Sequence, residues 1–197
     1  MEEKFGHKAL STGDMLRAAV ENQTEVGLQV GERIASGNLV PDNLIVAMVA
    51  ARIDEPDCAD GVILDGFPRT LAQAKMFDRV LVGLELEINL VILFEAEDEA
   101  MVERISGRFS CARCGEGYHD LNKPLSREGI CDVCGGQRFR RRADDNPETI
   151  RHRLKDYHAL TEPLLPFFRE KGVLKAIDAM ADIKQLEFEI ESLMKNA

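Results

Sequence analysis

Short apolar runs of strand length alternate with stretches of helical periodicity along most of the chain. The runs cover residues 62–64, 88–94 and 173–177, with helical patterns between and around them. Near-continuous apolar strands separated by helices are typical of a parallel sheet with helices on both faces. We therefore expect an α/β fold in which right-handed crossovers connect the strands.

Capping signals predict where three helices begin. Asp42 is a candidate N-cap for an apolar, buried helix over 43–53. Asn146, followed by Pro147, opens a second helix, and Asp182 opens the last one. Helical spacing predicts the inward residues of these last two helices to be Ile150, Leu154 and Tyr157 in one, and Ile183, Leu186, Ile190 and Leu193 in the other.

Length and charge restrict the class of protein. The chain has 197 residues, enough for one core with small inserted subdomains. Its formal net charge of -10 argues against nucleic acid or an anionic membrane surface as a general partner. The longest apolar run, 44–51, is too short to span a bilayer, and residues 1–4 do not open a signal peptide. We expect a cytoplasmic enzyme.

Four of the five cysteines form two Cys-x2-Cys pairs, Cys111 with Cys114 and Cys131 with Cys134. Two such pairs can surround one metal ion tetrahedrally, and zinc is the ion we expect, although iron accepts the same ligands. Two disulfides or a redox pair are the alternative, which the lack of an export signal disfavours. Arginines surround this segment, so we expect a metal-held flap that closes over phosphates; they are Arg104, Arg108, Arg138, Arg140, Arg141, Arg142, Arg151 and Arg153.

Two further segments carry residues suited to phosphate. The sequence Asp-Gly-Phe-Pro-Arg-Thr at 65–70 follows the first apolar run, and ligands of parallel sheets bind beyond the carboxyl ends of the strands. Asp65 can hold water on magnesium, and Arg69 offers a planar fork to a phosphate, unless the segment is an ordinary capped turn. Ser-Thr-Gly-Asp-Met-Leu-Arg at 11–17 combines a helix start with an arginine, which favours an anion site over a merely capped surface helix.

Together these segments resemble the adenylate kinase family. Leu-Val-Pro-Asp at 39–42 and Gln73 add to the likeness, and the cysteines, Tyr118-His119 and the run 142–145 leading to Arg153 match its long-lid, zinc-bearing type. The resemblance extends from about Lys4 to the C-terminus. It implies one domain over 1–197 with a P-loop NTPase-like parallel sheet, an AMP-binding flap over 11–40 and a zinc-bound lid over 107–145.

The resemblance also implies a reaction and its residues: reversible phosphoryl transfer from MgATP to AMP giving two ADP, by a monomer. Zinc (Zn2+) would be structural, and Mg2+ would accompany ATP. The residues implied for AMP are Thr12, Arg17, Asn38, Leu39, Val40, Gly66, Arg69 and Gln73. Those implied for ATP are Arg104, Arg108, Gly117, Tyr118 and Ala181. The catalytic set is Arg69, Arg108, Arg142, Arg153 and Asp65, with Asp144 and Asp145 orienting the lid arginines.

The chain departs from the family at its start. The family opens with an apolar strand and a phosphate loop, Gly-x-x-Gly-x-Gly-Lys, whereas no glycine here is followed by lysine. The loop cradles the β- and γ-phosphates, and its strand lies centrally, so we expect the neighbouring strands to be unpaired on one edge. A start placed at an internal methionine or a truncation, a shortened relative that still binds AMP, and complementation by a separate fragment are three explanations.

Two other functions remain open. One is a kinase for another nucleoside monophosphate, against which Thr12 and Gln73 weigh. The other is a catalytically impaired nucleotide-binding or zinc-ribbon interaction protein, which the missing loop favours.

Overall fold

The computed structural model describes residues 2–35, 40–142 and 144–196, and the chain divides into two compact units. Unit 1 comprises Met1–Ile92, Leu160–Lys175 and Glu187–Ala197, and unit 2 comprises Leu93–Ala159 and Ala176–Leu186. The expected flap segment therefore belongs to unit 1 and the expected lid segment to unit 2.

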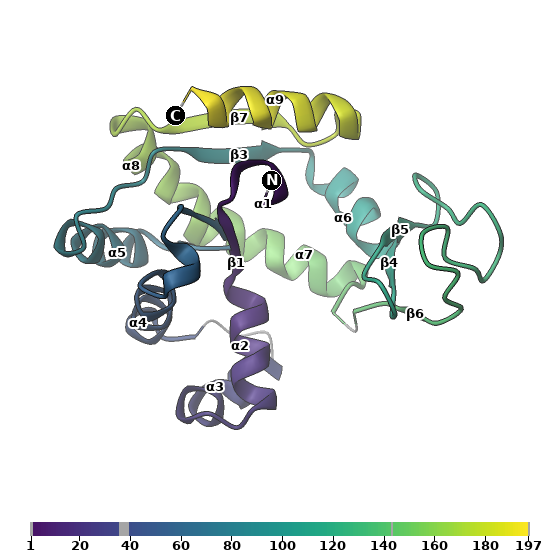
Figure 1. Cartoon of the computed structure of the whole chain (residues 1–197), viewed down its shortest axis with the longest axis horizontal. Coiled ribbons are helices and arrows are strands. Elements are labelled where there is room, and N and C mark those ends of the chain that lie inside the picture. The colour runs from purple at the N-terminus through teal and green to yellow at the C-terminus, as the bar shows by residue number, and fades with distance from the viewer. Residues whose placement is uncertain (1, 36–39, 143, 197) are drawn as a thin grey trace. The chain divides into compact units, whose positions relative to one another are not determined.

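Unit 1 contains a two-stranded parallel sheet. Strand β1 (Lys8–Ser11) pairs with β2 (Val62–Asp65), in a register running from Lys8 opposite Val62 to Ser11 opposite Asp65. The apolar run at 62–64 predicts β2, but β1 was missed because its four residues begin with a charge and carry no apolar run. Figure 1 shows β1 leading directly into helix α2.

The helices of unit 1 begin where side chains can cap them. In α2 (Thr12–Glu21) the Ser11 hydroxyl accepts from the Asp14 N–H, and in α5 (Leu71–Gly83) the Thr70 hydroxyl accepts from the Gln73 N–H. The remaining described helices here are α1 (Glu2–Phe5), α3 (Glu25–Ala35), α4 (Asp42–Ile53), the 3-10 turns η1 (Pro56–Cys58) and η3 (Glu162–Leu164), and α8 (Leu165–Glu170). Helices α2 and α3 pack together (Figure 1).

The main core of unit 1 lies among these helices and β1. Its buried side chains include Leu10, Val30, Val49, Phe67 and Phe77. The prediction of a buried helix over 43–53 is confirmed, since α4 contributes buried residues to this core.

The prediction that Asp42 caps α4 is wrong. The N-cap is Pro41, and no side-chain hydrogen bond caps this helix. The Asp42 carboxylate instead accepts from Gln73 Nε2 at 2.8 Å and from Thr70 Oγ1 at 3.3 Å. The Asp42 carboxylate thus bonds to the Gln73 and Thr70 side chains in place of the backbone N–H groups of its own helix. The sequence spacing around Asp42 cannot reveal these two distant donors.

A second two-stranded sheet joins β3 (Val91–Glu95) to β7 (Leu174–Asp178). The Val91 N–H donates to Val173 O at one end, and the Ala179 N–H donates to Glu95 O at the other, so the strands run parallel. Both strands were predicted, within a few residues, from their apolar runs.

The expected single sheet is thus two separate pairs. Within the described ranges, β2 is hydrogen-bonded to β1 alone and β3 to β7 alone. The apolar runs of β2 and β3 predict strands buried on both faces, yet Val62, Ile63 and Leu64 are only half-buried and Phe94 is 51% exposed. Each of these strands therefore has a hydrogen-bonded neighbour on one side only within the described residues.

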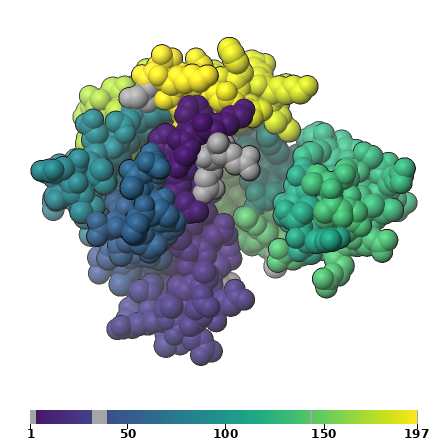
Figure 2. Space-filling model, in the orientation of Figure 1, coloured from purple at the N-terminus to yellow at the C-terminus, as the bar shows by residue number. Residues whose placement is uncertain are grey.

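Unit 2 holds a three-stranded antiparallel sheet that the sequence did not predict. Its order is β5-β4-β6, with β4 (Arg108–Cys111) between β5 (Gly117–His119) and β6 (Phe139–Arg140). Figure 2 shows the teal-to-green segment that contains it as a compactly packed mass. Helix α6 (Asp98–Ser106) precedes this sheet; α7 (Pro147–Asp156), continued by a π-helical turn η2 (Tyr157–Thr161), follows it.

The two remaining capping predictions fare differently. The Asn146 side chain accepts from the Thr149 N–H at 2.9 Å, which confirms the start of α7. Helix α9 (Ile183–Lys195) begins after Asp182 as expected and buries Leu186, but Ile183 is 62% exposed, so its inward assignment is wrong. Helical periodicity identifies the apolar face of a helix but not where the surface it packs on ends.

In the part of the chain that is described, none of the helices combines the length and the apolar character needed to cross a bilayer.

Candidate functional site

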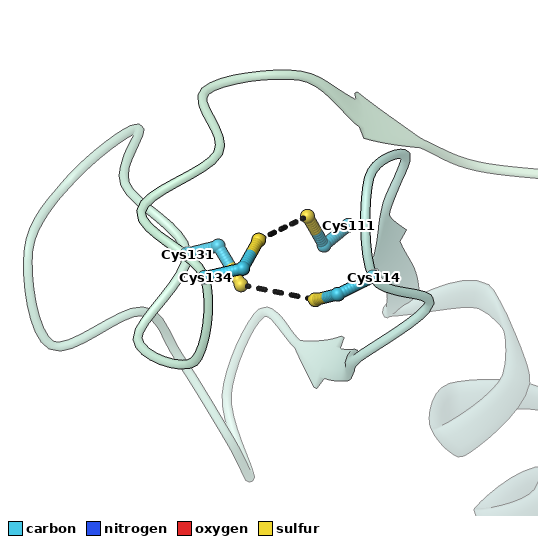
Figure 3. A group of neighbouring side chains, drawn as sticks. All are labelled: Cys111, Cys114, Cys131 and Cys134. Carbon is cyan, nitrogen blue, oxygen red and sulfur yellow. Dashed lines mark hydrogen bonds between the residues drawn. The ribbon is translucent and has the colours of Figure 1, made fainter.

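The four paired cysteines converge on one point in unit 2. The Sγ atoms of Cys111, Cys114, Cys131 and Cys134 all lie within 4.8 Å of one another. Cys111 Sγ is 3.6 Å from Cys134 Sγ, and Cys114 Sγ is 3.6 Å from Cys131 Sγ (Figure 3). Tetrahedral thiolates on zinc at about 2.3 Å lie about 3.8 Å apart, so this spacing fits one ion. A disulfide needs about 2.05 Å, and all five cysteines are free thiols.

The backbone repeats one turn at each cysteine pair. Gly115 N–H donates to Cys111 O at 3.0 Å, and Gly135 N–H donates to Cys131 O at 2.9 Å. Both glycines have positive φ, +79° and +69°, which suits glycine at the end of such a turn. A Cβ on Gly136 would lie 3.3 Å from the Sγ atoms of Cys111 and Cys134, so this glycine keeps space beside the sulfurs.

The four thiols differ in their surroundings. Cys111 and Cys131 are buried, Cys134 is half-buried and Cys114 is exposed. The hydroxyl of Tyr118 lies 3.2 Å from Cys131 Sγ, and this hydrogen bond lowers the pKa of the Cys131 thiol to about 6. A lowered pKa favours the thiolate, which is the form that binds metal.

In unit 1 the segment after β2 forms a turn that is held by hydrogen bonds. Gly66 has φ +72°, and its carbonyl accepts from Arg69 Nε at 2.8 Å and from the buried Thr12 hydroxyl at 3.2 Å. A Cβ on Gly66 would lie 2.8 Å from Arg69 Nη2, so the guanidinium would have to move if this glycine were replaced. Asp65 is exposed at the end of β2. A carboxylate that holds a water molecule on a cation must be exposed in this way.

Gln73 fixes the same turn from within. Its side chain is 1% exposed, its Oε1 accepts from the Arg69 N–H at 2.7 Å, and its Nε2 donates to Asp42. The amide is therefore already bonded to protein at both ends. Sequence reasoning assigned Gln73 to AMP but missed Asp42 as its partner, because these residues lie 31 positions apart.

The other residues expected around AMP lie in unit 1 or outside the described ranges. Arg17 forms an ion pair with Asp14, and its guanidinium would lie 3.3 Å from a Cβ on Gly13, over the start of α2. Val40 is buried. Asn38 and Leu39 fall outside the described residues.

In unit 2 the expected phosphate-binding arginines meet carboxylates. Arg108 Nε and Nη2 donate to the two carboxylate oxygens of Asp145 at 2.6 and 2.9 Å, and the Asp145 side chain is 2% exposed. This bond raises the pKa of the Arg108 guanidinium. Arg153 pairs with Asp144, and Arg142 is exposed close by in sequence. Asp145 and Asp144 are thus each paired with one of the expected phosphate-binding arginines.

Two regions expected near ATP also meet in unit 2. Arg104 Nη1 donates to the carbonyl of Ala179, two residues before Ala181, in the connection between β7 and α9. Gly117 is exposed on β5. The Tyr118 side chain is buried among the cysteines of residues 108–140, the segment from β4 to β6 that forms the ribbon. The Tyr118 side chain therefore faces the cysteines, and only its backbone remains as a candidate for nucleotide contact.

Sequence reasoning also missed a structural role for His119. Its Nδ1 accepts from the N–H groups of Leu121 and Asn122 at 3.0 and 3.1 Å, and its Nε2 lies 3.4 Å from Glu103 O. A Cβ on Gly107 would lie 2.4 Å from this ring, so glycine is needed at that point. His119 thus fastens the ribbon to the end of α6.

The residues predicted to bind AMP and those predicted to bind ATP belong to different units. The described residues expected to bind AMP all belong to unit 1, together with Asp65. Those expected to bind ATP, together with Arg142 and Arg153, all belong to unit 2.

Comparison with known proteins identifies the family of this chain. The adenylate kinase family model matches residues 1–173. The chain is 47% identical over 192 residues to an adenylate kinase of Allorhizobium ampelinum, covering 98% of this chain and 89% of that protein. It is 49% identical over 192 residues to one of Rhizobium rhizogenes, with the same coverage, and 49% identical over 183 residues to one of Magnetococcus marinus, covering 93% and 85%. The chain belongs to the adenylate kinase family.

Proposed function

We propose that this chain catalyses reversible transfer of the γ-phosphoryl group of MgATP to AMP, giving two ADP. The observation that carries the proposal is the turn after β2, in which Gly66, Arg69 and Gln73 are fastened so that a guanidinium stands at the carboxyl end of a parallel strand. The names of the relatives support the same reaction.

Phosphoryl transfer needs alignment and positive charge more than covalent chemistry from the protein. Arg69, Arg108, Arg142 and Arg153 would supply that charge around the transferred group. Mg2+ bound with ATP would neutralise the β- and γ-phosphates, and Asp65 would hold its water. Zn2+ in the four-cysteine cluster would be structural, because four thiolates leave no open position.

The carboxylates already bonded to these arginines suggest how nucleotides would bind. Arg17 forms an ion pair with Asp14, Arg153 with Asp144, and Arg108 with Asp145. A phosphate offers Arg108 the same bidentate oxygen geometry that Asp145 provides, with more charge. Nucleotide phosphates would therefore exchange with, or add to, these carboxylates at side chains that are already oriented.

A nucleotide-binding protein with a metal-binding cysteine cluster and little turnover is the alternative function, and a kinase acting on another nucleoside monophosphate is a variant of the first proposal. A monomer in the cytoplasm is proposed in either case; five free thiols fit a reducing compartment.

ADP formation from ATP with AMP, GMP, CMP or UMP, together with calorimetric AMP binding, separates these functions. Turnover that is highest with AMP supports the kinase, and AMP binding without turnover supports the alternative. Arg69→Ala should lower kcat/KM at least about 100-fold. Arg79→Ala, an exposed arginine on α5, is the matched control and should leave kcat/KM unchanged. Equal effects of the two substitutions on kcat/KM would show that Arg69 takes no part in the reaction.

A further inference from the structure

The hydroxyl of Tyr118 has two neighbours inside the metal ribbon. The Asp132 N–H lies 2.8 Å from it, and Cys131 Sγ lies 3.2 Å from it. The side chain is only 4% exposed, so water does not compete freely for these positions.

The Asp132 contact leaves the hydroxyl proton of Tyr118 free for the sulfur. A backbone N–H can only donate, so it uses an acceptor lone pair of the Tyr118 oxygen and not its proton. A metal-bound Cys131 is a thiolate and carries no proton, so in that form Tyr118 is the donor and the sulfur is the acceptor.

The packing of the ring holds the hydroxyl at that place. The Tyr118 ring stacks on Phe109 with centroids 5.5 Å apart and meets the edge of Phe139 at 5.9 Å. Its backbone pairs with Phe109 across β4 and β5. A side chain fixed by two aromatic neighbours and a strand register loses little freedom when it makes the hydrogen bond.

We propose that Tyr118 is an outer-shell partner of the ribbon's metal site, whose hydroxyl positions the Cys131 thiolate and raises the affinity for the metal. A hydrogen bond to a coordinating sulfur withdraws part of its charge and fixes its orientation, and such partners typically change metal affinity about 10- to 100-fold. This role goes beyond the proposed function, since it concerns retention of the metal whether or not the chain turns over ATP.

Tyr118→Phe tests the role, because it keeps the packed ring and removes only the hydroxyl. The variant, loaded with Zn2+, should lose its ion to a chromophoric chelator with an affinity at least about 10-fold weaker than that of the wild-type chain. Loaded with Co2+, it should show a sulfur-to-cobalt charge-transfer band at longer wavelength, because sulfur lone pairs without the hydrogen bond lie higher in energy.

Two controls separate the hydroxyl from packing. Tyr157→Phe removes the other of the chain's two tyrosine hydroxyls and should change neither measurement. Phe109→Leu loosens the ring stack but keeps the hydroxyl, so it should leave the charge-transfer band in place even if metal affinity falls. A Tyr118→Phe protein with wild-type affinity and an unmoved band would overturn the proposal, as would a wild-type chain that binds neither ion.

Discussion

Single ion pairs in unit 2 show how burial, more than contact distance, decides what a residue contributes. Arg108 with Asp145 and Arg141 with Asp120 are both close pairs, at 2.6 and 2.5 Å. The Asp145 carboxylate is buried and bonded through both oxygens, whereas Asp120 and Arg141 are each half exposed. Water screens the second pair and hardly reaches the carboxylate of the first.

Asp145→Asn should therefore lower the free energy of unfolding by about 1 kcal/mol, a value discounted because Arg108 is itself partly exposed. Asp120→Asn, the matched control, should change it by less than about 0.5 kcal/mol. Urea denaturation of both variants checks the difference. Similar losses in the two would mean that the buried carboxylate is not what holds Arg108.

Gly66 is a second residue whose surroundings decide its role. It combines φ +72° with a guanidinium that a Cβ would approach to 2.8 Å. Gly66→Ala should destabilise the protein by about 1–2 kcal/mol and displace Arg69. Gly83→Ala, at the end of α5 where a Cβ meets nothing within 4 Å, should be neutral or slightly stabilising. Thermal unfolding compares them, and a Gly66→Ala protein as stable as Gly83→Ala would contradict the argument.

At the scale of elements, one chain of hydrogen bonds joins the start of α4 to the turn before α5. Asp42 bonds to Gln73 and Thr70, and Gln73 bonds to the Arg69 backbone. The link ties a helix terminus to a turn that begins 23 residues later, at Asp65. Helix periodicity predicts both elements but not this link, because a buried polar partner leaves no periodic signal in the sequence.

Asp42→Ala should lower the free energy of unfolding by about 1–3 kcal/mol, because it leaves a buried amide without its acceptor. Asp42→Asn keeps an acceptor oxygen and should recover a substantial part of the loss. Chemical denaturation gives the energies, and calorimetric AMP affinity should fall in the same order, since the turn carries Arg69. If Asn destabilised as much as Ala, the charge of Asp42 and not its hydrogen bond would be responsible.

For the strands too, the sequence predicts where an element lies but not which strand it pairs with. The apolar runs of β2 and β3 identify them as strands of a parallel sheet, yet the described structure pairs each with one neighbour. The antiparallel sheet of unit 2 was not anticipated, because β6 has only two residues and β5 only three. Strands this short are held by the metal ribbon and its aromatic cluster, and contain too few residues to show a period of two.

For the whole molecule, the two units should respond separately to loss of the metal. Four cysteines belong to the cluster in unit 2, while Cys58 is 6% exposed in the main core of unit 1. Metal binding stabilises the cooperatively folding unit that contains its ligands, which here is unit 2. Cys58 is therefore an internal control for the remainder of the chain.

In the metal-loaded protein, a thiol reagent should react slowly with all five cysteines. After chelation four thiols should react rapidly, and Cys58 should stay protected until urea unfolds unit 1. Mass spectrometry of the labelled peptides distinguishes the sites. Rapid labelling of Cys58 together with the other four would mean that the metal stabilises the whole chain and not the ribbon alone.

The sequence by itself determined the α/β class, the four cysteines that cluster, the Asp65–Thr70 turn and the family. Each of these rests on residues close together in the chain or on a short, specific spacing. Only the tertiary structure decided that Asp42 serves Gln73 in place of a helix cap and that Tyr118 faces a cysteine. The reason is physical: periodicity and spacing record local geometry, whereas the partner of a buried polar group depends on which distant segment packs against it.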